Sequence, residues 1–295
     1  MVAIVPEIDA ASGMKRADVA CYAAKKAGRN RASIYTSGDS DVHGHHEDMQ
    51  IAGDIRNALS EDRFSLFAQK IVAMDEIPAS RYELFLRMRD RAGEMLSPAQ
   101  FIPAMERFDL MADLDRWVLD RALRHYGPQF SALPNLQLFI NLSANSLNDP
   151  KFLPFFLQLV EDSVVLPTTL TLEITETALI NNLVAAGDVI EKLRSIGCKV
   201  ALDDFGIGVS SFSYLRHFKV DFIKIDGSFV RNMLKSAVDL AIVKSINNIA
   251  HELHTHTIAE HVEDDAILRK SIGLGIDYAQ GYVFGFPRPL EEEFA

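Results

Sequence analysis

From Arg63 onward, short apolar runs rich in Val, Ile, Leu and Phe alternate with longer amphipathic stretches. This alternation is typical of repeated strand and helix units around a parallel sheet. There are about eight such runs, the number that closes a TIM-type barrel. They begin near Phe64, Arg81, Leu136, Leu170, Cys198, Val220, Thr255 and Ile276. The pattern therefore predicts an α/β fold, a TIM-type (β/α)8 barrel that takes up most of the chain.

Helices are expected between the runs, because apolar residues there recur at helical spacing. Asp188–Ile196 carries its apolar residues on one stripe, and Val230–Leu253 is predicted to be a single longer helix. Ala99–Arg107 follows Pro98, and a proline suits the first turn of a helix.

The residues that precede the predicted barrel do not show this alternation of apolar runs and amphipathic stretches. Residues 36–47 are polar and rich in turn-forming residues, which predicts a linker. Its His43, His45 and His46 raise the alternative of a transition-metal site, but no second ligand cluster accompanies them, so we favour a solvated loop by about four to one. Residues 1–35 hold one helix pattern and one strand pattern, too little to bury a core alone. The large domain is predicted over 48–295.

Composition and charge limit the function more than the fold. Hydrophobic residues make up 48% and charged residues 24% of the chain, as in soluble globular proteins. The formal charge of −11 disfavours DNA as a partner, and an anionic small substrate would need bound cations or well-placed basic side chains. Cys21 and Cys198 give no disulfide framework, and no apolar stretch approaches the roughly 18 residues of a membrane span. A cytoplasmic location is expected for this domain, even if a longer protein were membrane-anchored.

Polar residues end most of the apolar runs, and in this type of barrel catalytic groups come from the carboxyl ends of several strands. The residues at or near those ends are Glu83, Asn141, Glu173, Asp203, Asp204, Lys224, Glu260 and Gln280. Since residues two apart in a strand share a face, Glu83 and Arg87 point the same way, as do Phe222, Lys224 and Asp226.

Five carboxylates around one pocket cannot coexist without neutralisation, and hard divalent cations with oxygen ligands are the usual solution. Two magnesium or manganese ions about 4 Å apart can hold a phosphodiester and activate a bridging water. Lys224 could orient that water, and Arg87 could grip a phosphate oxygen.

The alternative for any single acid is a helix cap, which we favour by about three to one for a residue such as Asp204 or Glu176 taken alone. Six oxygen-bearing residues in register on separate strand ends reverse that preference, since caps do not require Glu within apolar strands.

The region from about residue 48 to 295 resembles the EAL-domain family of cyclic di-GMP phosphodiesterases. The motifs that carry the resemblance are NLSANSL from Asn141, LEITET around Glu173, ALDDFGIGVSSFSYL around Asp203, FIKIDGSFV around Lys224, AEHVE around Glu260 and AQGYVF around Gln280. The resemblance implies hydrolysis of cyclic di-GMP to linear pGpG in bacterial signalling, supported by magnesium or manganese and inhibited by calcium.

The resemblance also implies residue roles. The two metal ions would be held by Glu83, Asn141, Glu173, Asp203, Asp204 and Glu260. Lys224 and Gln280 would support the reaction centre, and Gln69, Arg87 and Asp226 would touch the dinucleotide. Glu176 would tether the loop Asp204–Ser211, which resembles a loop linked to metal sensing and to homodimer formation.

Three departures from the family pattern stand out. Glu83 is followed by Leu84 and Phe85 where the family has Ala and Leu, so Leu84 is expected to face the helix layer and Phe85 the pocket. Lys70 replaces a proline. His261 stands where glycine is common, and would strain that turn if a positive φ is needed.

The segment RADVACYAAKKAGRNRASIY resembles the last helix and strand of a GGDEF diguanylate cyclase domain, which implies upstream GGDEF or sensory domains in a longer protein. Two other functions stay open for the large domain. One is a catalytically weak EAL domain acting as a cyclic di-GMP receptor or scaffold. The other is an unrelated barrel lyase that uses carboxylate-bound magnesium.

Overall fold

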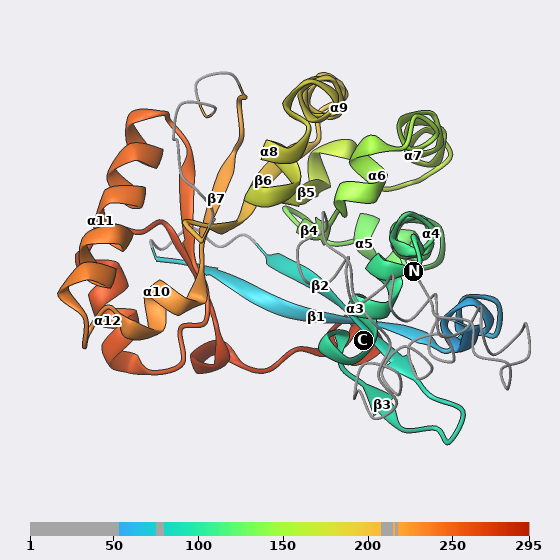
Figure 1. Cartoon of the computed structure of the whole chain (residues 1–295), viewed down its shortest axis with the longest axis horizontal. Coiled ribbons are helices and arrows are strands. Elements are labelled where there is room, and N and C mark those ends of the chain that lie inside the picture. Colours follow the sequence, from blue (N-terminus) through green and yellow to red (C-terminus); the bar gives the residue numbers. More distant parts are fainter. Residues whose placement is uncertain (1–52, 75–79, 208–214, 216–217, 295) are drawn as a thin grey trace, which may run out of the picture.

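The computed structural model describes residues 53–74, 80–207, 215 and 218–294 (Figure 1). The segment predicted over 1–35, the linker over 36–47 and both boundaries between them and the large domain lie outside the described residues. No helix in the described ranges is long and apolar enough to cross a lipid bilayer.

Eight strands form a closed barrel. They pair in the order β1, β9, β8, β7, β6, β5, β4 and β2, and the barrel closes because β2 also pairs with β1. They are β1 (Phe64–Ala73), β2 (Arg81–Arg89), β4 (Gln137–Asn141), β5 (Leu170–Thr175), β6 (Lys199–Phe205), β7 (Phe222–Ile225), β8 (His256–Ala259) and β9 (Tyr278–Gln280). Each begins within two residues of a predicted apolar run. The predicted TIM-type barrel is confirmed.

The first strand is the exception to the predicted parallel arrangement. β1 pairs antiparallel with β2, with Phe64 opposite Met88 and Ile71 opposite Arg81, and antiparallel with β9. Only residues 74–80 separate β1 from β2, whereas a parallel crossover needs a dozen or more residues. The prediction of a helix between every pair of runs is therefore wrong at this point. The short strand β3 (Met95–Leu96) pairs antiparallel with β2, and the short strand β10 (Arg288–Pro289) pairs antiparallel with β1.

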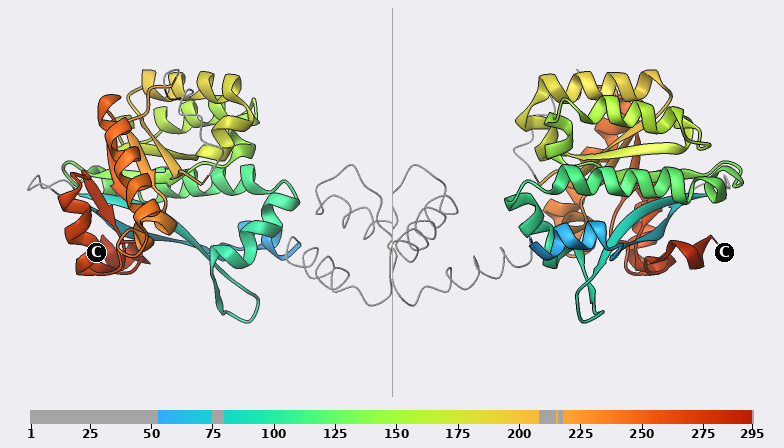
Figure 2. Two further views of the ribbon diagram at one scale, coloured as in Figure 1. Left: turned by 60° about the vertical axis from the view of Figure 1, so that its left-hand side comes forward. Right: turned by 90° about the vertical axis from the view of Figure 1, so that its right-hand side faces the viewer.

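Helices surround the strands, as the two side views show (Figure 2). They are α3 (Pro98–Arg107), α4 (Met111–Asp120), α5 (Gly127–Ser131), α6 (Ala144–Asn148), α7 (Phe152–Glu161), α8 (Glu176–Asn181), α9 (Leu183–Ser195), α10 (Gly227–Asn232), α11 (Ala237–Glu252), α12 (Asp265–Gly273) and α13 (Leu290–Glu293), with a π-helical turn over Arg121–His125 and 3-10 turns over Pro167–Thr169 and Tyr282–Phe284.

One predicted helix is broken. Val230–Leu253 was expected to be continuous, but α10 ends at Asn232 and α11 starts at Ala237. Ser236 begins the second helix by accepting a hydrogen bond from the backbone N–H of Asp239. A serine cap of this kind satisfies an otherwise unpaired N–H donor and starts a new helix. The apolar pattern is therefore continuous across a break between two helices.

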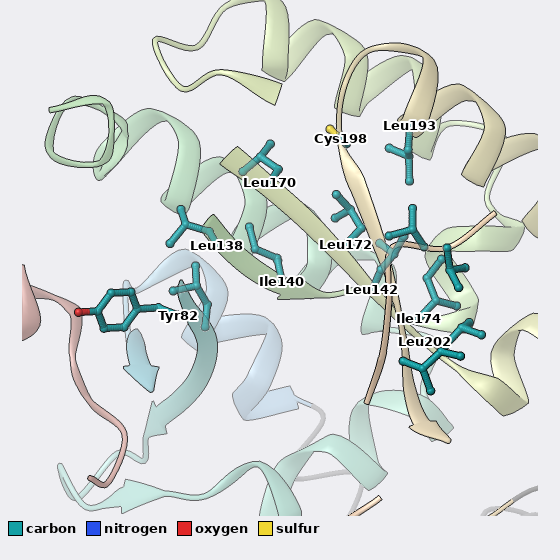
Figure 3. Packing of buried hydrophobic residues seen from close by; sticks show 14 of the residues in the cluster. Tyr82, Leu138, Ile140, Leu142, Leu170, Leu172, Ile174, Leu193, Cys198 and Leu202 are labelled. Atoms are coloured by element: carbon teal, nitrogen blue, oxygen red, sulfur yellow. The ribbon is translucent and has the colours of Figure 1, made fainter. Parts of the chain in front are cut away.

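The core has an outer and an inner part. Alternate strand residues such as Ile140, Leu172 and Leu202 pack outward against helix residues such as Leu193 of α9 (Figure 3). The other face of the strands points into the barrel, where a small apolar cluster lies. Its members are Ile71, Phe139, Ala201, Phe222 and Ile258. Phe222 faces inward and Ile223 and Ile225 outward, as the strand periodicity predicts.

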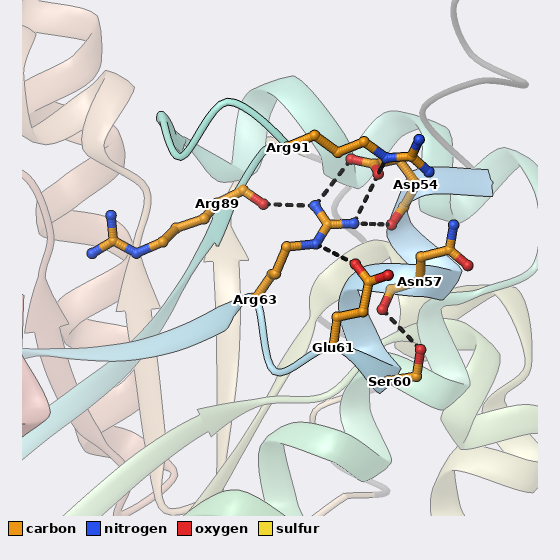
Figure 4. A network of polar contacts seen from close by, with 7 residues as sticks. All are labelled: Asp54, Asn57, Ser60, Glu61, Arg63, Arg89 and Arg91. Atoms are coloured by element: carbon orange, nitrogen blue, oxygen red, sulfur yellow. Dashed lines mark hydrogen bonds and ion pairs between the residues drawn. The ribbon is translucent and has the colours of Figure 1, made fainter.

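A second apolar cluster joins the helical stretch over residues 53–60 to α3, α4 and the adjoining ends of β1 and β2. A polar network fixes this stretch in place (Figure 4). The guanidinium of Arg63 donates to both carboxylate oxygens of Asp54, at 2.8 and 3.1 Å, and to the carbonyl oxygen of Arg89 at 2.8 Å. The chain thus enters β1 from a helix that is anchored to β2.

Candidate functional site

Lys224 lies at the centre of an acidic basin formed where the parallel strands end. Its side chain is 1% exposed and its Nζ contacts four carboxylates, each from a different strand or strand end. The distances are 3.1 Å to Glu83 Oε2, 3.0 Å to Glu173 Oε1, 3.1 Å to Asp203 Oδ1 and 2.9 Å to Glu260 Oε1. Strand periodicity places all five side chains on the inner face of the barrel. The predicted convergence of these residues is therefore present in the structure.

Two amides and a second glutamine hold Glu83 in position. Asn141 Nδ2 donates to Glu83 Oε1 at 2.9 Å, and Gln280 Nε2 donates to Glu83 Oε2 at 2.8 Å. Gln280 also lies 3.3 Å from Gln69 Oε1, and Gln69 donates to the carbonyl oxygen of Gly285 at 2.9 Å. Glu83 is thus fixed from both sides by neutral donors.

Asp203 and Asp204 face the same basin although they are consecutive residues of a strand. The β6–β7 register shifts between Leu202 and Phe205, and Asp204 has a φ of 53°. Such a bulge re-aims a side chain that would otherwise point to the opposite face. Ligand oxygens of Asp203, Asp204 and Glu260 consequently lie within 4.8 Å of one another.

Burial and mutual repulsion favour protonation of several of these acids. Burial raises the pKa of Glu260 to about 8, with repulsion by Asp203 adding to the effect against the attraction of Lys224. Burial, followed by repulsion from Asp203, raises the pKa of Asp204 to about 6. Burial and the charge of Glu83 raise the pKa of Glu173 well above its usual value.

Glu83 and Lys224 keep their charges. Burial acts to raise the pKa of Glu83, but the attraction of Lys224 and the hydrogen bonds from Gln280 and Asn141 outweigh it and lower that pKa. Burial acts against the charged form of Lys224, yet the surrounding carboxylates raise its pKa well above the normal range. One ammonium therefore faces more carboxylates than it can neutralise.

The donor set fits divalent cations. Glu173 Oε2 is buried and has no hydrogen-bond partner among the described residues. Glu173 Oε1 and Asp203 Oδ1 touch Lys224 at ion-pair distance but without hydrogen-bond geometry, so their lone pairs are only partly used. Buried, unsatisfied carboxylate oxygens are the ligands that hard divalent cations prefer.

Glu176 lies one turn beyond the basin. It is buried at the start of α8, after Thr175 has capped that helix, and its Oε2 accepts a hydrogen bond from the backbone N–H of Gly206 at 3.1 Å. The contact ties α8 to the chain that leaves β6. Residues 208–211 of the loop Asp204–Ser211, which Glu176 was expected to tether, lie outside the described residues.

The three residues expected to touch substrate are placed differently from one another. Gln69 is part of the basin's network. Arg87 is half-buried, with its guanidinium 5.3 Å from the Phe67 ring centroid, and burial lowers its pKa. Asp226 caps α10 by accepting a hydrogen bond from the N–H of Ser228 at 2.8 Å, so the helix-cap alternative applies to this residue.

Two of the three departures from the family pattern have structural explanations, and for Lys70 the structure shows only a distant contact, with its Nζ 5.9 Å from the Tyr82 ring centroid. Leu84 packs outward in the main core, as expected, and half-buried Phe85 lines a cavity of about 560 Å³ together with Asn141 and Asp204. His261 does adopt a positive φ, of 50°. A Cβ added to Gly227 would lie 2.2 Å from the His261 ring, so the ring occupies space that only glycine leaves open.

One residue near the site was missed from the sequence. Asp115 is buried in α4, and its Oδ2 accepts hydrogen bonds from Ser143 N at 2.9 Å and Ser146 Oγ at 2.7 Å. It therefore fixes the chain that follows Asn141. Burial raises the pKa of Asp115. Its place beside Leu114 and Leu119 on the apolar stripe of α4 was the available signal.

Comparisons with known proteins agree on one family. A sequence model described as the EAL domain matches residues 52–287. The chain is similar to the cyclic di-GMP phosphodiesterase PdeB of Shewanella oneidensis, at 37% identity over 97% of this chain and 33% of that protein. It is also similar to the cyclic di-GMP phosphodiesterase PdeF of Escherichia coli, at 34% identity over 80% of this chain and 31% of that protein. The chain thus spans about a third of the length of these relatives.

A solved structure shows the same fold. The PaMucR phosphodiesterase in complex with c-di-GMP superposes with a TM-score of 0.78 at 28% identity, over 83% of this chain and 99% of that one.

Proposed function

The chain belongs to the EAL domain family, and from this premise we propose that it hydrolyses cyclic di-GMP to linear pGpG with the help of two magnesium or manganese ions. The relatives named as cyclic di-GMP phosphodiesterases support the reaction, and the acidic basin supports the dependence on metal. Cyclic di-GMP is the proposed partner of this site.

The observation that carries the proposal is the cluster of four carboxylates on the ammonium of Lys224, with the buried Glu173 Oε2 left without a hydrogen bond. A buried group of this kind costs several kcal/mol unless further positive charge arrives. Divalent ions bring that charge and would hold the scissile phosphodiester at the same time. The proposed ligands are Glu83, Asn141, Glu173, Asp203, Asp204 and Glu260.

The chain's own residues have distinct proposed roles in the reaction. The ions, when bound, supply an activated water and stabilise charge on the phosphorus. Lys224 keeps its proton and orients that water, and Gln280 and Asn141 fix Glu83. The water oxygen would form the new bond to phosphorus as one P–O3′ bond breaks. A proton of that water would end on O3′, which leaves as a hydroxyl, and the phosphate stays on the 5′ side. Arg87 would bind a phosphate oxygen, and Gln69 and Asp226 would contact the dinucleotide.

Direct assay tests this function. Purified protein with magnesium or manganese should convert cyclic di-GMP to pGpG, quantified by chromatography, and calcium should inhibit the conversion. Glu83→Gln keeps the shape of the side chain but removes a charge, so it should lower turnover by about 100-fold or more. Lys192→Met, at an exposed position of α9, is the matched control and should behave as wild type. No product with either metal would refute the proposal.

A second candidate is a cyclic di-GMP receptor with little or no turnover. Phe85 favours it, because this residue replaces the leucine of the family pattern and lines a cavity that also borders Asn141 and Asp204. Binding measured by calorimetry without product over hours would support the receptor, and Phe85→Leu should then restore turnover.

Assembly and context complete the proposal. A homodimer through the chain near Asp204 would couple the two basins. Upstream GGDEF or sensory domains are proposed because the relatives are about three times longer than this chain. Sedimentation with and without cyclic di-GMP tests the dimer.

A further inference from the structure

We propose that the end of the barrel opposite the acidic basin is a binding site for a phosphate group, held by Arg81 and Lys199. A cavity of about 620 Å³ opens at this end. Its walls come from the starts of parallel strands: Arg81 begins β2, Gln137 begins β4 and Lys199 begins β6, while Thr168 and Thr169 directly precede β5.

In the described part of the chain, the two cations contact neutral groups and aromatic rings. Arg81 Nε donates to Gln137 Oε1 at 3.1 Å, but Arg81 Nη1 is buried without any hydrogen-bond partner in the described part of the chain. The guanidinium lies 4.4 Å from the Tyr278 ring centroid, and Lys199 Nζ lies 5.7 Å from that of Phe222. Among described residues, neither cation has a carboxylate oxygen within ion-pair distance.

Two acids of the described residues, Asp221 and Asp277, are engaged with other partners. Asp221 pairs with Arg194 and accepts the N–H of Val200 at 2.9 Å. Asp277 accepts from Thr257 and His251. Burial lowers the pKa of Lys199, and repulsion by Arg81 acts in the same direction while Asp221 opposes it. Two like charges therefore face one cavity, in a chain whose net charge is −11.

The lining chemistry suits a tetrahedral oxyanion. The lining includes an arginine, a lysine and two threonines, and guanidinium, ammonium and hydroxyl groups are the donors that usually hold phosphate. The cavity volume falls within the range of roughly 300–1,000 Å³ found for small-molecule sites, so the phosphate could be free or part of a small phosphorylated compound. The structural alternative is that Arg81 and Lys199 merely stack on aromatic rings to close the barrel.

Calorimetric titration of the full chain with inorganic phosphate, and separately with glycerol phosphate, tests the proposal. EDTA and constant ionic strength keep metal-held anions out of the basin. One saturable site is expected, and tighter binding of the ester would assign a phosphorylated compound as the ligand. Arg81→Met and Lys199→Met keep the apolar stems and should each weaken binding about tenfold or more. Lys192→Met should bind as wild type.

The result that overturns the proposal is equal affinity in wild type and in both methionine variants, or no binding at millimolar phosphate. Thermal melts identify any variant that fails to fold, and Lys199→Met carries the test if Arg81→Met fails to fold.

The chain between β1 and β2 contains Asp75 and Glu76. Binding that appears only in the double variant Asp75→Asn, Glu76→Gln would also overturn it, because the cations would then serve the protein's own acids. Anomalous density from tungstate-soaked crystals should lie beside Arg81.

Discussion

The two ends of the barrel are built from the same strands but carry opposite charge. β2 provides Arg81 at one end and Glu83 two residues later, and β6 provides Lys199 and then Asp203. An apolar layer around Phe222 lies between the two ends. At the carboxyl end one ammonium meets too many carboxylates, whereas at the amino end two cations meet neutral donors and aromatic rings.

This difference shows how position along a strand selects function. Alternation alone puts every second side chain inside the barrel, at both ends equally. What distinguishes the carboxyl end is the surplus of buried negative charge, which has no structural use and therefore points to bound metal. The amino end of such barrels more often serves stability, whereas here its two cations line a cavity and have no carboxylate at ion-pair distance among the described residues.

Lys224→Met should have the largest effect on this comparison, because it leaves several buried carboxyl groups without the one ammonium that they share. In EDTA the free energy of unfolding should fall by about 3–5 kcal/mol, measured by urea denaturation. Manganese should recover part of this loss, and turnover should fall on the order of 10³-fold. Lys199→Met, an equivalent change at the opposite end, should leave turnover nearly unaltered. A Lys224→Met protein as stable as wild type in EDTA would contradict the charge argument.

The metal-free basin should also make stability fall as pH rises. The pKa of Glu260 is raised from 4.5 to about 8 and that of Asp204 from 3.8 to about 6, so the folded state holds more protons than the unfolded state in between. This stabilisation is complete below pH 4 and disappears as pH climbs toward 8. Thermal melts in EDTA between pH 5 and 8 measure it. Glu260→Gln should flatten the profile, and a profile rising with pH in wild type would count against the basin's electrostatics.

Asp277 should show the opposite pH dependence with a smaller effect. Burial acts to raise its pKa, but hydrogen bonds from His256, the Thr257 backbone and His251 outweigh this and lower it. Its contribution is therefore present above about pH 4 and is lost as pH falls below that value. Asp277→Asn should cost about 1–2 kcal/mol at pH 7, seen in urea midpoints, and should change the acid limb of the melt profile. An unaltered acid limb would show that another group governs it.

The smallest expected effect is at His261. Its φ of 50° is costly for a residue with a Cβ, so His261→Gly relieves backbone strain. The same change removes the ring that covers Gly227, and the two effects nearly cancel. Unfolding free energy should change by less than about 1 kcal/mol, with turnover conserved. A large loss of stability would mean that the ring, rather than the backbone, determines this turn.

Strand positions and the inward set of acids could be predicted from the sequence because both depend on period-two patterns. The direction of β1 could not, since an apolar run looks the same in either direction, and only the short connection over 74–80 held a signal. The bulge that turns Asp204 into the basin and the break at Ser236 depend on backbone geometry that hydrophobicity does not record. Arg81 and Lys199 could not be singled out from the sequence, because catalytic groups of such barrels come from the carboxyl ends of the strands and these two residues stand at strand starts.

The reversed direction of β1 decides where the preceding chain is attached. Phe64 lies opposite Met88, so the helical stretch over 53–60 sits at the mouth of the acidic basin rather than at the far end. A displacement of the helical stretch over 53–60 would therefore act directly on β1, the strand that contains Gln69. If β1 ran parallel to its neighbours, the same stretch would be attached at the opposite end of the barrel, a full strand length from the acidic basin.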